Sequence, residues 1–211
     1  MRVFSEAAET ARRIKVLLIL VAFLYVGSYL AGWYLLSIKS PMAVETSQAL
    51  RQSVLTQQPF TSILQSLRGG ELVKAILVTF LVNLTTGAFL TTTLPGTVPL
   101  VGSLGTIAVT VLRGFVVGIT YPEVLSSSPL GFVLGLGTMI LELGAYVFSG
   151  AAGINIALAP ILPGRHSVQS RWVAFKMAWK DAAKIYVIVI ILLALGAVWE
   201  MTGLFLALRP T

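Results

Sequence analysis

The stretch VLLILVAFLYVGSYLAGWYLL, residues 16–36, decides the fold, because none of its residues carries a charge. A run of about 18 or more mostly apolar residues is long enough to cross the hydrocarbon core of a bilayer as a helix. Four comparable stretches follow in a chain of 211 residues, of which 11% are charged, with a mean hydropathy of +0.90. The sequence therefore predicts an all-α integral membrane protein.

Proline and glycine residues mark the ends of the predicted spans. The second span follows Gly69-Gly70, the third stops before Pro122, and the fourth follows Pro129. We predict a bundle of five transmembrane helices, at residues 16–36, 72–92, 98–120, 130–156 and 185–208. They form a single membrane domain over residues 1–211, because this length leaves no room for a separate soluble domain. The first apolar stretch is longer than that of a signal peptide, which predicts a retained anchor.

The distribution of Lys and Arg predicts the orientation in the plasma membrane. With a cytoplasmic N-terminus, nine of these residues lie inside and five outside, and Arg113 lies within a helix. The positive-inside rule therefore favours a cytoplasmic N-terminus and an outer C-terminus. The inner residues are Arg2, Arg12, Arg13, Lys15, Arg165, Arg171, Lys176, Lys180 and Lys184, and the outer ones are Lys39, Arg51, Arg68, Lys74 and Arg209.

Two connections between spans carry amphipathic patterns. The outer segment, residues 37–71, has an apolar stripe at helical spacing, made by Phe60, Ile63, Leu64 and Leu67. The inner segment, residues 165–184, has aromatic residues on one face and lysines on another, including Trp172, Trp179, Lys176, Lys180 and Lys184. Such helices suit the membrane interface, where aromatic rings reach acyl chains and lysines meet anionic headgroups. The alternative is that the basic residues only fix the orientation of the fifth span.

Arg113, Glu142 and Glu200 fall within predicted spans, where a charged side chain is costly and normally faces the interior of the bundle. The predicted topology places all three at a similar depth, on helix faces rich in small residues that permit close helix contact. Asn83 belongs to a similar polar face of the second span. Two interpretations stay open. The cluster is either an ion pair that fixes helix packing, with Glu142 the expected partner of Arg113, or a site for substrate or protons.

Patterns typical of enzymes are missing from the sequence. There is no Cys, which excludes disulfides, zinc–thiolate sites and thiol catalysis. His166 is the single histidine, and no cluster of metal-ligating residues accompanies it. The formal charge of +7 gathers at the ends of spans rather than on a nucleic-acid-binding surface. We therefore expect a protein that is not an enzyme, with no metal, no cofactor and no nucleic-acid partner.

Five short segments occur in order along the spans: Phe80-Leu-Val-Asn83, Arg113-Gly-Phe-Val-Val-Gly-Ile119, Ile140-Leu-Glu142, Gly150-Ala-Ala-Gly153 and Ala197-Val-Trp-Glu200. Their order and spacing resemble those of the stage II sporulation protein M (SpoIIM) family. Members of that family often carry Pro-His-Gly just before the glutamate of the fourth helix. Here those positions are Gly137-Thr138-Met139, so any role of that histidine is absent or altered. The resemblance implies a non-enzymatic polytopic membrane protein; in spore formers, a member works with cell-wall-degrading partners during engulfment.

Two functions are compatible with these observations. The first is a scaffold or partner-assembling membrane component, either homo-oligomeric or bound to a partner membrane protein. Small-residue stripes such as Gly114-Phe-Val-Val-Gly118 motivate it, because they permit close helix contact. The second is a small transporter or permease subunit that uses the intramembrane Arg/Glu cluster. A structure in which packed side chains seal the charged residues would argue against the second function.

Overall fold

The protein is a bundle of helices. A computed structural model describes residues 2–208, except the side chains of residues 54, 123, 124, 126 and 127. Among the described residues there is no strand, and five helices are long and apolar enough to cross a membrane. These five are Lys15–Ser37, Leu72–Thr97, Val101–Pro122, Pro129–Leu158 and Arg171–Leu208. The predicted all-α fold with five spans is therefore confirmed.

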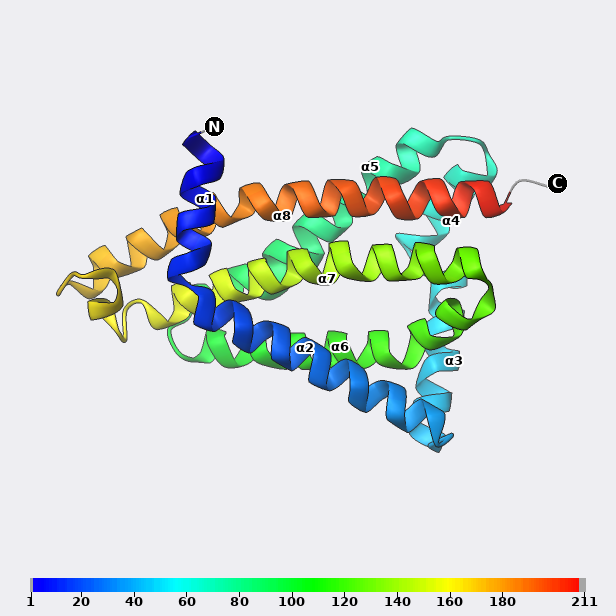
Figure 1. The fold of residues 1–211 in the computed structure, drawn as a ribbon, viewed down its shortest axis with the longest axis horizontal. Helices are drawn as coiled ribbons and strands as arrows, with labels where there is room; N and C mark the ends of the chain where they lie inside the picture. Colours follow the sequence, from blue (N-terminus) through cyan, green and yellow to red (C-terminus); the bar gives the residue numbers. More distant parts are fainter. Residues whose placement is uncertain (1, 209–211) are drawn as a thin grey trace.

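The helices pack lengthwise, with shorter helices across the two ends. In chain order they are α1 (Arg2–Arg13), α2 (Lys15–Ser37), α3 (Pro41–Thr56), α4 (Phe60–Arg68), α5 (Leu72–Val82), η1 (Asn83–Thr93), η2 (Leu94–Thr97), α6 (Val101–Ser127), α7 (Pro129–Leu158), η3 (Pro163–His166) and α8 (Arg171–Leu208). Figure 1 shows α1 crossing α8 near one end of the bundle, which we call the α1 end. Helices α3 and α4 lie at the opposite end, with α4 beside the end of α8 and α3 beside α6, and we call this the α3–α4 end.

The second span is helical throughout but is not a single α-helix. Its α-helical part, α5, ends at Val82, and the following η1 is a π-helix of 11 residues. A π-helix pairs each N–H with the carbonyl five residues back, and such stretches are usually single turns, often at functional sites. Polar groups of η1 bond to neighbouring spans, as described below. The hydropathy pattern predicted this span but not its π-helical half.

The helix that carries the third span continues past the proline at which it was expected to stop. Helix α6 extends to Ser127 with Pro122 inside it, so the predicted end before Pro122 was wrong. Proline removes one backbone donor and disturbs the preceding turn, and helices of membrane proteins tolerate this where their neighbours supply other contacts.

The basic inner segment is mostly the first part of the fifth span. After η3, residues 171–208 form one helix of 38 residues. Trp172 is 62% exposed and stacks on Phe175, with ring centroids 5.6 Å apart, and Lys176 Nζ lies 5.2 Å from the Trp172 centroid. Trp179 instead packs toward η1, with its ring 6.5 Å from that of Phe89. Of the two predicted interface tryptophans, Trp172 is therefore the more exposed one.

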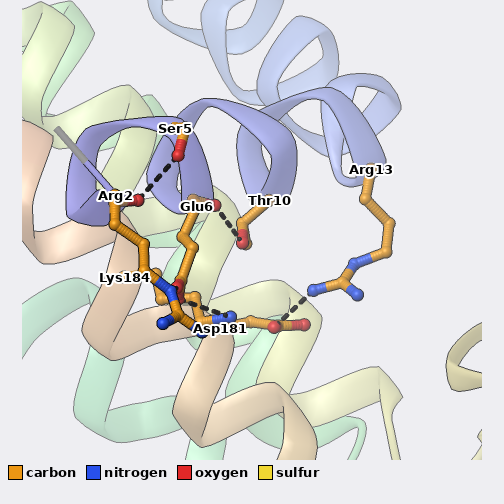
Figure 2. Close-up of polar contacts among 7 residues, drawn as sticks. All are labelled: Arg2, Ser5, Glu6, Thr10, Arg13, Asp181 and Lys184. Atoms are coloured by element: carbon orange, nitrogen blue, oxygen red, sulfur yellow. Dashed lines mark hydrogen bonds and ion pairs between the residues drawn. The ribbon is translucent and has the colours of Figure 1, made fainter.

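Helix α1 is held onto α8 by ion pairs that no sequence pattern predicted. Arg13 pairs with the buried carboxylate of Asp181, and Lys184 Nζ lies 3.3 Å from Glu6 Oε2. Figure 2 shows both contacts between the two helices. Lys184 therefore has a protein partner, whereas Lys176 and Lys180 are exposed.

His166 belongs to the same cluster at the α1 end. Its side chain is buried, and Nδ1 lies 3.7 Å from Asp181 Oδ2. Burial lowers the pKa of His166, and the nearby Arg13 and Arg165 lower it further, against the opposing effect of Asp181. The folded protein thus favours the neutral imidazole.

The basic residues assigned to the inner side lie on α1, on η3, and around the first turns of α2 and α8. Figure 1 shows these elements near the α1 end. Which end faces the cytoplasm stays a prediction, and Arg209, counted on the outer side, lies outside the described residues.

Small residues bring helix backbones into direct contact inside the chain. A Cβ added to Gly153 of α7 would lie 1.9 Å from the Thr92 carbonyl oxygen of η1. A Cβ added to Gly118 of α6 would lie 2.2 Å from the Tyr29 carbonyl oxygen of α2, and one on Gly114 would lie 2.1 Å from Ser28 Oγ. The predicted small-residue faces of α6 and α7 are thus used to pack this bundle.

Candidate functional site: an intramembrane cavity with two carboxylates

A cavity of about 840 Å³ lies toward the α3–α4 end of the bundle. Residues of α3, α4, α5, η1, α6, α7 and α8 line it, and most of them are apolar. Its polar and charged lining residues are Arg51, Ser53, Thr79, Asn83, Thr120, Tyr121, Glu142 and Glu200. A volume of hundreds of cubic ångströms with apolar walls and a few polar groups is typical of small-molecule sites.

The predicted apolar stripe of the outer segment helps to cover this cavity. Phe60, Ile63 and Leu64 of α4 line it, whereas Leu67 is buried in a cluster with Ile63 and Met201. The amphipathic pattern of α4 was thus interpreted correctly as a helix with one apolar face. Part of that face turns onto α5 and α8, which neighbour α4 in the fold.

Glu142 is anchored by a neutral partner. It lies on the small-residue face of α7, and its Oε1 accepts a hydrogen bond of 2.7 Å from Asn83 Nδ2 at the start of η1. The sequence placed both residues on inward faces, and the structure brings them together. A carboxamide donor holds the carboxylate in position without neutralising its charge.

Glu200 lines the same cavity from α8. Among the described residues, its carboxylate has no hydrogen-bond or ion-pair partner. One turn earlier, a Cβ added to Gly196 would lie 3.4 Å from Glu142 Cγ, so the turns that carry the two carboxylates are adjacent. Like charges in a low-dielectric cavity repel each other, and a bound cation or proton would relieve that repulsion.

Arg113 is bonded through Nη2 to a different part of the bundle, while its buried Nη1 has no hydrogen-bond partner among the described residues. Its Nη2 donates to the Gly87 carbonyl oxygen at 3.0 Å and to Thr91 Oγ1 at 3.1 Å, both in η1. Its Cζ lies 4.0 Å from the centroid of the Tyr146 ring, within the range of a cation–π interaction. The predicted ion pair with Glu142 is not formed among the described residues, nor is one with Glu200. No pattern in the sequence indicated that a π-helix would offer Arg113 these acceptors.

A second, smaller cavity lies between the guanidinium of Arg113 and the carboxylate of Glu142. It measures about 190 Å³, and Arg113, Tyr121, Glu142 and Tyr146 are among its lining residues. Since one water molecule takes roughly 30 Å³ of liquid, this space has room for a few. Glu142 and Tyr121 line both cavities, so they lie between Arg113 and the larger cavity.

Among the side chains that the structure describes, no group of three or more His, Cys, Asp or Glu residues is arranged to hold a metal ion. Among the described residues, two carboxylates and one Arg side chain line the large cavity, together with apolar groups. Intramembrane carboxylates of this kind commonly mark a path for ions, protons or substrates.

The sequence that forms these spans matches a known family. The family model for stage II sporulation protein M matches residues 16–202, which include most of the chain and all the residues of the cluster. The chain belongs to the stage II sporulation protein M family. Comparisons with curated proteins and with solved structures found no match.

Several of the segments that carried the SpoIIM resemblance converge on the cavities. Asn83, Glu142 and Glu200, which each end one of these segments, line the larger cavity. Trp199 Nε1 donates to the Leu134 carbonyl oxygen at 3.0 Å. A Cβ added to Gly137 would lie 2.3 Å from that same nitrogen. Gly137 is the first of the three positions where other members often carry Pro-His-Gly, so in this chain the indole nitrogen occupies the space beside it.

Proposed function

We propose that this SpoIIM-family protein is a small transporter or permease subunit that holds its substrate in the 840 Å³ cavity. The observation that carries the proposal is that Glu142 and Glu200 line this cavity from different helices, and that Glu200 has no partner among the described residues. The two carboxylates thus line a space instead of packed side chains, which supports this proposal over a cluster that only fixes helix packing.

Comparison with the other buried charges supports the same function. Arg113 is held by a carbonyl, a hydroxyl and a ring, and Asp181 is held by Arg13. A charge that serves only helix packing is normally paired in this way. Glu200, in contrast, faces a space large enough for a ligand, which fits a binding role better than a packing role.

The second candidate function is the scaffold or partner-assembling component that the family resemblance implies. One observation favours it: Gly27 of α2 is exposed, and no atom lies within 4 Å of a Cβ added there. This leaves room for a second helix to approach closely. The Gly114 and Gly118 positions that first motivated the idea are occupied by α2 of the same chain. Crosslinking in native membranes tests this function, and strictly monomeric recovery without a partner would contradict it.

A cysteine-accessibility experiment tests the permease function without knowledge of the substrate. The chain has no native Cys, so a single introduced cysteine is a unique probe. Thr120 lines the cavity, whereas Thr110, also on α6, is fully buried. The two are matched, because each hydroxyl donates to the carbonyl four residues earlier at 2.8 Å. We expect Thr120→Cys to react with a membrane-impermeant thiol reagent and Thr110→Cys to stay unreactive. Equally slow reaction of both, from either side of the membrane, would contradict the proposal.

The proposed orientation also predicts from which side of the membrane the reagent should reach the cavity. With the N-terminus in the cytoplasm, the α3–α4 end and its cavity lie nearer the outer surface. Thr120→Cys should then react faster with reagent added outside. In the same orientation, the exposed Lys176 and Lys180 lie on the inner side, where we propose that they meet anionic headgroups.

A further inference from the structure

We infer that the occupant of the large cavity is an organic cation with apolar substituents. This rests on the proposed function, since it names the substrate class of the same cavity. Three properties of the cavity support it: the charge of the lining residues, the chemistry of the walls and the size of the space.

The charges favour a cation over an anion. Two carboxylates line the cavity, and the single Asn83 amide that bonds Glu142 is neutral. Arg51 is the one basic residue among the lining residues that the structure describes, so the carboxyl groups outnumber it. Arg113 is engaged by η1 and Tyr146, in the smaller cavity beside Glu142. An anion entering the large cavity would meet Glu200 with no additional cation to offset the repulsion.

The walls favour an organic cation over a metal ion. A hard metal ion takes about six or more oxygen ligands or keeps much of its water shell. The cavity is instead surrounded mainly by side chains such as Ile63, Leu64, Met201 and Leu204. Phe60 and Tyr121 add aromatic rings, whose faces attract cations. A ligand with one positive centre and apolar groups would satisfy both the carboxylates and these walls.

Two ions of matched shape and opposite charge test the inference. Tetraphenylphosphonium and tetraphenylborate each carry four phenyl rings around one central charge. We expect the full-length protein in phosphatidylcholine nanodiscs to bind the phosphonium more tightly, after subtraction of binding to empty nanodiscs. Glu200→Gln should weaken phosphonium binding by roughly tenfold or more, and Glu142→Gln should also weaken it.

Glu71→Gln is the matched control, because Glu71 lies outside the cavity lining and its exposed carboxylate pairs with Lys74 at 2.7 Å. It should leave phosphonium binding unchanged. Nanodiscs of phosphatidylglycerol, which has no ammonium group, separate two sources of the cation after the same subtraction of empty nanodiscs: tighter phosphonium binding there than in phosphatidylcholine would support a lipid ammonium group as the occupant, and unchanged binding would support a free cation.

Equal affinity for the two ions would overturn the inference, and so would full phosphonium binding by both Gln variants. These outcomes are distinct from failure of the permease function. A reactive Thr120→Cys without phosphonium preference leaves the permease with another substrate class. Phosphonium binding that depends on Glu200, with Thr120→Cys unreactive from both sides, supports the cation site and contradicts transport.

Discussion

Helix α7 has a packed half and a hollow half. The two differ in burial and in the hydrogen bonds of the polar groups around them. Residues 149–157 are buried without interruption, near the α1 end. Between residues 129 and 144, only Gly135 and Thr138 are buried, and this half faces the cavity through Glu142. The same helix, with the same small-residue face, therefore serves two purposes along its length.

Polar groups in the packed half are bonded to one another across helices. Thr92 Oγ1 lies 2.8 Å from Ser149 Oγ, and Thr93 Oγ1 lies 2.9 Å from the Tyr186 hydroxyl. Beside the hollow half, Glu142 is bonded to Asn83, whereas Glu200 of the neighbouring α8 has no hydrogen-bond or ion-pair partner among the described residues. Because an unpaired polar group in a membrane is costly, the difference favours a packed half that maintains the fold and a hollow half that binds a ligand.

The largest effect should come from enlarging a contact residue in the packed half. Gly153→Ala would place a methyl group 1.9 Å from the Thr92 carbonyl oxygen. The clash is with backbone atoms, so the two helices would have to move apart, whereas a flexible side chain could change its rotamer. We expect a loss of about 3 kcal/mol in unfolding free energy, measured by denaturant titration in bicelles. Gly105→Ala is the control, since no atom lies within 4 Å of its added Cβ. Equal stability of the two variants would contradict the packed half as described.

Removal of the arginine should have the next largest effect. Arg113→Met deletes two hydrogen bonds and the contact with the Tyr146 ring, and should lower the unfolding free energy by about 2 kcal/mol. Tyr146→Phe keeps the aromatic face and should cost clearly less. A larger loss from Tyr146→Phe than from Arg113→Met would show that the hydroxyl, rather than the ring, matters at this position.

A smaller effect is expected from pH at the α1 end. The pKa of His166 is lowered in the folded protein, so the unfolded chain binds a proton more readily. Stability should be full above the unfolded value of 6.5 and should fall as the pH drops below it. The thermal midpoint between pH 7.5 and pH 5.5 should therefore decrease, and His166→Gln should reduce that decrease. An unchanged pH dependence in His166→Gln would assign the effect to another group.

The sequence predicted the parts of this fold that depend on hydropathy and on small-residue spacing. Uncharged runs located all five spans, and Thr106, Thr110 and Thr138, on the small-residue faces of α6 and α7, are buried. The π-helix and the passage of α6 through Pro122 depend on contacts between helices, which no local pattern encodes.

The candidate site was predicted in part. Asn83, Glu142 and Glu200 do share one cavity, as their inward faces indicated. Glu142 was wrongly predicted as the partner of Arg113, because only carboxylates were considered. The observed partners are the Gly87 carbonyl, Thr91 and Tyr146, and no sequence pattern identifies them. Only the three-dimensional arrangement of η1 and α7 places those groups around the guanidinium.

The stability of a double variant tests most directly whether the two carboxylates serve a ligand rather than the fold. Glu142→Gln with Glu200→Gln removes both charges, and the amide oxygen introduced at position 142 can still accept the hydrogen bond from Asn83. We predict an unfolding free energy within about 0.5 kcal/mol of wild type, or higher, because ligand sites often lower stability. A loss as large as that of Arg113→Met would contradict the account, since it would show that both carboxylates hold the bundle together.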